Sequence, residues 1–285
     1  MKKYIIIVWL GIVLLTACSS LKQTRSAASF VDPFICSQGD HGQWHPSALV
    51  PFGLVKLGPD TYPASLTGSG DCAHSGYDYS DNHIRGFSHF RRGSSGGTSV
   101  SDRAGLLSIL PFSRKHDAAW MKSPIVTIDK AKEKAECGYY TTYISDENIL
   151  VELSATAHTG YHRYTYGRDT KAKIMINGRK GKLTIQKIDN YTLEGCLQCD
   201  STNFYFKMVF NASIINTQTF VSDGTMKMGK SMKSISSGGY LCDFGQLHGR
   251  PLEIKVGFSL TSQLEAQKNY TAECANASFS QIRKK

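Results

Sequence analysis

Regular alternation of apolar and polar residues restricts the possible folds of this sequence more than any other feature. The clearest run places large apolar side chains at every second position, namely Leu252, Ile254, Val256, Phe258 and Leu260. A second run repeats the pattern with Phe204, Phe206, Met208 and Phe210. Successive side chains of a β-strand point to opposite faces, so each run predicts a strand with one buried face.

Similar period-two patterns occupy residues 149–166, 182–188 and 191–197. Asp189 and Asn190 separate the last two stretches. Both residue types favour tight turns, so this pair predicts a hairpin.

The composition changes along the chain. Residues 125–261 carry the alternating patterns without a long amphipathic helix, whereas residues 30–112 are rich in Gly, Pro, Asp and His. The second composition predicts loops between short strands. Together the two zones predict an all-β fold, with a β-sandwich over residues 30–261.

The pattern becomes helical at Ser262. Residues 262–265 form a capping box, which predicts a helix running toward Glu273. Residues 278–281 repeat this signal just before Lys285. We interpret residues 262–285 as a short helical linker toward a domain that this chain lacks; the alternative is an ordinary frayed C-terminus.

The N-terminus has the features of an export signal. Lys2 and Lys3 precede an apolar run over residues 4–15, and Cys18 follows Leu-Thr-Ala. This order predicts a lipoprotein signal peptide over residues 1–17, lipidation at Cys18 and a polar tether over residues 18–29. The alternative is an ordinary signal peptide with a chance cysteine. The expected location is the bacterial cell envelope, lipid-anchored at the outer membrane, with the periplasmic or surface face left open.

The positive charge of the chain does not predict a nucleic-acid partner. Lys and Arg number 33 against 23 Asp and Glu, a formal net charge of +10. These basic residues are scattered, and an envelope location removes nucleic acid as a natural partner. We interpret the charge as a solvated surface that could attract anionic lipid or polysaccharide.

The cysteines do not predict a metal site. The chain has eight, and Cys196 and Cys199 have CxxC spacing. A zinc or redox site needs a second ligand pair or a helix N-terminus, and neither lies beside them. Buried or disulfide-linked cysteines between strands are the preferred interpretation.

An ordered set of short motifs carries a family resemblance. They stand at residues 31–35, 46–48, 51–53, 58–61, 75–81, 84–89, 138–140, 151–156, 162–166 and 255–259. In this order they resemble the N-terminal domain of glycoside hydrolase family 92, the calcium-dependent exo-acting α-mannosidases. The resemblance covers roughly residues 30–285 and implies a supersandwich-like β-sandwich.

The same resemblance implies where the chemistry lies. In the family an (α/α)₆ helical barrel follows the sandwich and carries the general acid, the general base and the calcium-binding residues. Inverting glycoside hydrolysis needs two carboxyl groups about 6.5–9.5 Å apart. No residue of this chain matches the family positions for either, so we expect no catalytic residue, no metal and no cofactor in it.

The loops resemble the part of the sandwich that closes over the sugar. Mannose recognition uses planar polar groups and an aromatic ring against the apolar sugar face. The candidate substrate-binding residues are His41, Trp44, His45, Tyr77, Asp78, Tyr79, Asp81, Ser88 and His89. Structural alternatives stay open: Tyr77 and Tyr79 could share a strand face and pack, Asp78 and Asp81 could cap turns, and His89 could be a core histidine.

Three functional hypotheses follow. The chain is the non-catalytic front module of a mannosidase-like glycan-degrading lipoprotein, and hydrolysis needs a separate helical-barrel chain. Alternatively it is a stand-alone lipoprotein that binds α-mannose-containing glycan. The third possibility is an inactive remnant, whose exposed apolar surface would favour aggregation.

Overall fold

A computed structural model describes most of the chain. The described residues are 26–38, 44–62, 75–91, 105–178, 181–221, 226–228, 232–236 and 238–284. Two compact units comprise Met1–Val31 and Asp32–Lys285. Cys18 and His41 lie outside the described residues. No described helix is both long enough and apolar enough to cross a membrane.

In the first unit the described residues form one short turn of 3-10 helix, η1 (Ala27–Phe30). Ser26 caps this turn, because its hydroxyl accepts a hydrogen bond from the Ala28 amide at 3.3 Å. The end of the predicted tether therefore contains local structure.

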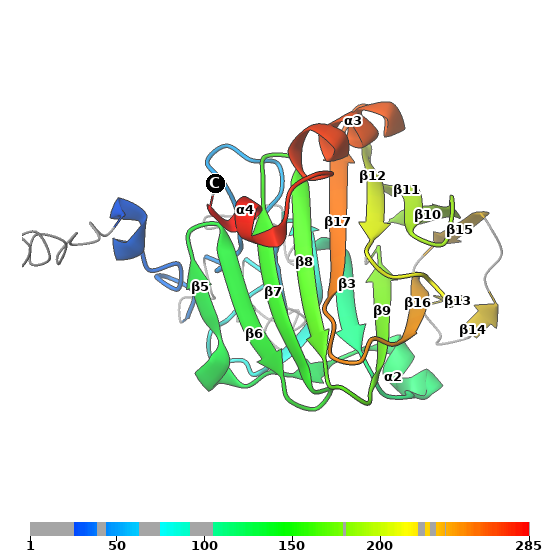
Figure 1. The fold of residues 1–285 in the computed structure, drawn as a ribbon, viewed down its shortest axis with the longest axis horizontal. Helices are drawn as coiled ribbons and strands as arrows, with labels where there is room; N and C mark the ends of the chain where they lie inside the picture. Colours follow the sequence, from blue (N-terminus) through cyan, green and yellow to red (C-terminus); the bar gives the residue numbers. More distant parts are fainter. Residues whose placement is uncertain are drawn as a thin grey trace, which may run out of the picture. The chain divides into compact units, whose positions relative to one another are not determined.

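The second unit is built from two antiparallel sheets (Figure 1). One has the order β1 (Gly58–Tyr62), β2 (His83–Phe90), β3 (Leu106–Phe112), β9 (Lys171–Asn177), β16 (Gly238–Gln246), β13 (Asn216–Val221) and β14 (Met226–Met228), and β4 (Val126–Thr127) pairs with β2. The other has the order β15 (Met232–Ser236), β10 (Lys182–Lys187), β11 (Thr192–Cys199), β12 (Thr202–Phe210), β17 (Leu252–Ser259), β8 (Thr159–Tyr166), β7 (Ile149–Ala155), β6 (Tyr139–Ile144) and β5 (Lys134–Glu136). Apolar side chains from both sheets share one core, so the predicted all-β sandwich is confirmed.

The alternating runs lie where the sequence predicts them. Their buried members on β12 are Phe204, Phe206, Met208 and Phe210, and those on β17 are Leu252, Ile254, Val256 and Phe258. β12 and β17 are neighbours and pair antiparallel. The predicted pattern extends one position too far, because β17 ends at Ser259 and Leu260 is 45% exposed.

The predicted hairpin turn is also confirmed. β10 and β11 pair antiparallel on either side of Asp189 and Asn190. The Asp189 carboxylate accepts a hydrogen bond from the Tyr191 amide at 2.6 Å, which fixes the turn locally.

Two helices at the C-terminus pack on the second sheet at one end of the strands (Figure 1). α3 (Gln263–Glu273) begins at Ser262, whose hydroxyl accepts from the Glu265 amide at 3.1 Å. In α4 (Phe279–Lys284), the Ser278 amide donates to Gln281 at 2.7 Å. Both helix starts are confirmed, with both bonds of the capping box at Ser278 and the N-cap bond at Ser262.

These helices are anchored by side-chain packing. A Cβ on Gly257 of β17 would lie 2.5 Å from the Tyr270 Cβ, so glycine permits α3 to lie directly on the strand. Phe279 of α4 is buried beside Tyr139 and Tyr161 of the sheet. Residues 262–284 are therefore part of the packed module.

Candidate functional site

Three loop segments that carry most of the predicted sugar-binding residues are joined by hydrogen bonds. The Ser75 hydroxyl donates to the Trp44 carbonyl at 2.9 Å. The Tyr79 amide donates to the Ser37 carbonyl, also at 2.9 Å. Residues 34–37, 44–48 and 75–81 consequently form one surface, which we call the loop surface.

Trp44 gives the loop surface an accessible aromatic ring. Its side chain is 44% exposed, and its ring lies parallel to the buried ring of His45, with the two planes 2° apart and the centroids 5.8 Å apart. Burial, together with the positive charges of Arg91 and Lys56, lowers the pKa of His45 well below its ordinary value. His45 is therefore neutral near pH 7, and its Nδ1 atom has no hydrogen-bond partner among the described residues.

A buried ion pair lies beneath the loop surface and is hydrogen-bonded to its backbone. Arg91 Nη1 lies 2.9 Å from Asp60 Oδ1, and both side chains are almost completely buried. Arg91 also donates to the backbone carbonyls of Ser75 at 3.0 Å and Gly58 at 2.7 Å. The guanidinium thus ties the loop containing Ser75 to the start of β1.

Tyr77 and Tyr79 lie in the turn before β2 and not on a strand. Tyr77 is fully buried and its hydroxyl donates to Glu133 at 2.9 Å, while Tyr140 donates to the same oxygen at 2.7 Å. Tyr79 is 38% exposed, and the Lys130 ammonium lies 4.1 Å from its ring centroid. Of the two tyrosines, only Tyr79 has a ring accessible to a ligand.

Glu133 is a buried carboxylate that the sequence analysis did not identify. Besides the two tyrosine hydroxyls it accepts a hydrogen bond from Lys130. Burial and the Glu133 carboxylate together raise the pKa of both tyrosines, so their hydroxyls remain protonated donors. Nothing in the local sequence separates Glu133 from its charged neighbours Lys132 and Lys134.

Asp78 caps a turn, as the structural alternative predicts. Its carboxylate accepts from the Ser80 amide at 2.8 Å and from the Ser80 hydroxyl at 2.6 Å. The Asp81 amide donates to the Asp78 carbonyl at 3.2 Å. Both aspartates are partly exposed at the edge of the loop surface.

Ser88 and His89, the two predicted residues on β2, lie inside the protein and have no exposed area. The Ser88 hydroxyl donates to the Asp60 carboxylate. His89 packs against Phe258 of the opposite sheet, with ring centroids 4.7 Å apart. The structure therefore does not bring either side chain to the loop surface.

His89 belongs to a hydrogen-bond chain that crosses the core. His89 Nδ1 lies 2.7 Å from the Leu107 carbonyl, which can only accept, so Nδ1 carries the proton. His89 Nε2 then accepts from His162 Nε2 at 2.8 Å, and His162 Nδ1 accepts from the Tyr164 hydroxyl at 2.7 Å. Burial lowers the pKa of His89 to about 4 and also lowers that of His162, so both rings are neutral.

A third buried carboxylate, Glu147, lies in the turn between β6 and β7, and its partner His116 precedes α2 (Ala118–Lys122). It accepts hydrogen bonds from the Ser113 amide at 2.7 Å, the Ser113 hydroxyl at 2.8 Å and His116 Nε2 at 2.7 Å. Burial alone would raise the pKa of Glu147, but the hydrogen bonds from His116, Ser113 and Arg114 outweigh it and lower the pKa to about 2. Glu147 is therefore ionised at neutral pH.

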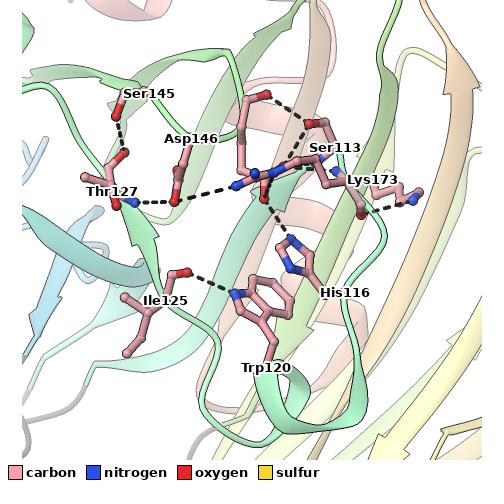
Figure 2. A network of polar contacts seen from close by, with 10 residues as sticks. Ser113, His116, Trp120, Ile125, Thr127, Ser145, Asp146 and Lys173 are labelled. Carbon is pink, nitrogen blue, oxygen red and sulfur yellow. Dashed lines mark hydrogen bonds and ion pairs between the residues drawn. The ribbon is translucent and has the colours of Figure 1, made fainter.

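The rings beside Glu147 make its surroundings rigid. Figure 2 shows His116 next to Trp120, whose indole donates to the Ile125 carbonyl at 3.0 Å. The His116 and Trp120 rings are stacked, with centroids 3.6 Å apart. This network fixes the loop between β3 and α2, and it contains none of the predicted site residues.

The described residues do not fit a metal site of their own. No three His, Cys, Asp or Glu side chains among them gather closely enough to hold an ion. Of the cysteines in this part of the chain, Cys199, Cys242 and Cys274 are buried. Burial raises the pKa of the Cys274 thiol to about 11, which makes it a poor nucleophile at neutral pH.

The family model that matches this chain and the solved structures of similar fold belong to the same family. Residues 30–259 match the description "Glycosyl hydrolase family 92 N-terminal domain". No curated protein sequence matches the chain.

Solved structures of similar fold come from the same family. They include the family GH92 α-mannosidase BT3965 from Bacteroides thetaiotaomicron, with 21% identity and a TM-score of 0.78 over 93% of this chain and 37% of that one. The GH92 inverting mannosidase BT2199 from Bacteroides thetaiotaomicron VPI-5482 has 21% identity and a TM-score of 0.76 over 92% of this chain and 35% of that one. The chain therefore spans roughly a third of the length of these mannosidases.

Proposed function

Because the chain belongs to the family of glycosyl hydrolase family 92 N-terminal domains, we propose that it is the non-catalytic, glycan-contacting module of an α-1,2-mannosidase-like lipoprotein. Hydrolysis then needs a separate (α/α)₆ helical barrel. The observation that carries this proposal is the match of residues 30–259 to the N-terminal domain of the family, whose fold the chain shares with a family α-mannosidase. A structure of that enzyme in complex with mannoimidazole supports mannose-containing glycan as the ligand class.

The buried carboxylates of the described residues are poorly suited to glycoside cleavage. Asp60 pairs with Arg91, Glu133 accepts from two tyrosines, and Glu147 accepts from Ser113 and His116. A catalytic pair must face the scissile bond from two sides, one as acid and one as base. As the family resemblance implies, the acid, the base and any calcium are expected in the barrel.

The loop surface offers suitable chemistry for sugar contact. The accessible rings of Trp44 and Tyr79 can lie against the apolar face of a pyranose, and Asp78 and Asp81 at its edge can accept hydroxyl hydrogen bonds. The neutral ring of His45 behind Trp44 has an unused Nδ1 atom. We propose Trp44, Tyr79, Asp78 and Asp81, together with His41, as the glycan-contacting set, and we give the buried side chains of His45, Tyr77, Ser88 and His89 a supporting role.

Reconstitution tests the need for a barrel. The chain is mixed at micromolar concentrations with a family 92 barrel produced without its own sandwich, and mannose release from mannobiose is measured. We expect a complex that releases mannose, while neither part does so alone. Mannose release by the purified chain itself, abolished by replacement of one of its own aspartates, would contradict the proposal.

A matched pair of variants tests the loop surface in the reconstituted complex. Trp44→Ala should raise the KM for mannobiose because a stacking ring is lost. Leu264→Ala removes a similarly exposed apolar side chain at the start of α3 and serves as the control. Equal KM values for both variants and the parent would exclude Trp44 from glycan contact.

A stand-alone glycan-binding protein is the second candidate function, and the accessible Trp44 ring favours it. A ligand that binds only the native state raises the melting temperature. Yeast mannan should therefore raise the Tm of the isolated chain. No shift at saturating mannan would reject this second candidate and leave the first one standing.

A further inference from the structure

A cavity of about 330 Å³ lies where three loops meet at one end of the sandwich. The hairpin turn between β10 and β11 is joined to the loop after β12, because the Ile214 amide donates to the Asn190 carbonyl at 2.7 Å. The Ile215 amide donates to the Asp243 carbonyl of β16 at 2.8 Å. None of the residues that line this cavity belongs to the loop surface.

The walls of the cavity carry accessible apolar groups. Tyr191 is 49% exposed and Ile215 is 69% exposed. Phe244 and Leu247 form a buried floor. Gly245 has a φ of 69°, and a Cβ at this position would lie 2.7 Å from Ile215 Cδ1. Glycine therefore permits the Ile215 side chain to lie close to the β16 backbone.

The cavity is lined by the planar side-chain groups of Asn211, Gln246 and Arg250, which form hydrogen bonds to the surrounding backbone, and by Ser213. The side-chain amide of Asn211 donates through Nδ2 to the Pro251 carbonyl at 3.0 Å, and its Oδ1 atom accepts from the Glu253 backbone N–H at 2.9 Å. Arg250 Nε donates to the Leu247 carbonyl at 3.4 Å. Gln246 also lines the cavity, and the lining includes no carboxylate.

The apolar walls and the polar side chains of the cavity together indicate which class of ligand it could bind. A purely apolar segment would remove water from the remaining N–H donors of Asn211, Gln246 and Arg250 without replacing its hydrogen bonds, and one arginine is a weak basis for a strongly anionic ligand. A pyranose has an apolar ring face for Tyr191 and Ile215, and hydroxyls for Asn211, Gln246 and Arg250. The volume lies at the lower end of the usual range of about 300–1,000 Å³ for ligand pockets.

We propose that this cavity is a second sugar site, which holds an uncharged mannosyl unit of the same glycan that contacts the loop surface. The choice of mannose rests on the proposed function, whereas the choice of an uncharged pyranose rests on the cavity itself. Two sites on one chain would retain a branched or repetitive glycan longer than either site alone.

Hydrogen–deuterium exchange of the full chain with yeast mannan tests the proposal. We expect mannan to protect amides in residues 188–191, 211–215 and 246–251, and separately in residues 44–48 and 75–81. Tyr191→Ala should remove only the first set of protections and weaken binding at that site about tenfold. Trp44→Ala should remove only the second set.

Two further variants keep the result interpretable. Leu150→Ala deletes a side chain that is 38% exposed on β7, and it should leave both sets of protections unchanged. Arg250→Met, at an exposed rim position, replaces Tyr191→Ala if that variant is unstable. It should likewise weaken only the cavity site.

The outcomes separate the two proposals. Absence of protection around the cavity in the parent chain, or protection that persists in Tyr191→Ala, overturns the second site alone. Absence of protection at the loop surface in the parent chain, with the cavity residues still protected, contradicts glycan contact at the loop surface and leaves the cavity site standing. A change of oligomeric state in Tyr191→Ala, with unchanged mannan protection, would assign the cavity to a protein interface and overturn the proposal.

Discussion

Mild acid should destabilise this sandwich through the histidine chain in its core. His89 and His162 are both completely buried and neutral, and each accepts or donates through both ring nitrogens. A proton added to His89 Nε2 would oppose the N–H donor of His162, and a proton added to His162 Nδ1 would oppose the hydroxyl donor of Tyr164. The unfolded chain has no such restriction and takes up protons at the ordinary histidine pKa.

The size of the effect follows from the pKa of His89, which burial lowers from 6.5 to about 4. At pH 5 the unfolded chain binds nearly one proton at this position, and the native chain binds about a tenth of one. The contribution of His89 to the free energy of unfolding is therefore fully present above pH 6.5, and it is lost as the pH decreases toward 4. Between pH 7 and pH 5 this histidine alone should remove about 2 kcal/mol from the free energy of unfolding. His162, whose pKa is also lowered, adds to the loss.

Urea denaturation at pH 7, 6 and 5, followed by circular dichroism, measures this loss. His89→Gln keeps a donor and an acceptor without a titrating group, so it should remove about 2 kcal/mol of the pH dependence. His248→Asn is the control, because His248 is exposed in a turn with a φ of 53° that asparagine tolerates. A parent chain equally stable at pH 5 and pH 7, or an unchanged pH dependence in His89→Gln, would refute the reasoning.

Three other outcomes are expected. Glu147→Ala should lower the free energy of unfolding by about 3–5 kcal/mol, because it leaves the buried donors of Ser113 and His116 without an acceptor. Urea denaturation measures this loss. As a control, Glu265→Ala removes an exposed carboxylate that pairs with Lys268, and it should cost under about 1 kcal/mol. Arg91→Met should cost a similar 3–5 kcal/mol by leaving Asp60 charged and buried, and the added change Asp60→Asn should recover part of it in a double-mutant cycle. Cys18→Ala should shift the chain from the membrane fraction to the soluble fraction of the producing cell, and equal fractionation would exclude a lipid anchor at this residue.

The local features of the fold could be predicted from the sequence because each depends on residues that are close together in the chain. The capping hydroxyls of Ser262 and Ser278, the turn at Asp189 and the alternation along β12 and β17 all act within a few residues. The order of the strands in the sheets could not be predicted from the sequence. β9 lies between β3 and β16, and this pairing joins segments far apart in the chain that no local pattern links.

The candidate site was predictable only in part. The sequence motifs identify the segments that form the loop surface, and Trp44 and Tyr79 are accessible there. Burial of individual polar residues was not predictable, because His89 and Ser88 look the same in the sequence whether they face a ligand or the core. Arg91 and Glu133 were not predicted to be buried, since charged residues normally lie in solvent.

The buried charges bear on whether the loop surface has a use. A buried ion pair adds little stability over well-packed apolar residues of similar volume, so stability alone does not account for it. Arg91 with Asp60 fixes the loop at Ser75, and Lys130 with Glu133 fixes Tyr77 and lies under the ring of Tyr79. Both pairs therefore restrict the positions of residues next to the accessible rings. Fixed positions of this kind are what the proposed contact between the loop surface and a glycan would require.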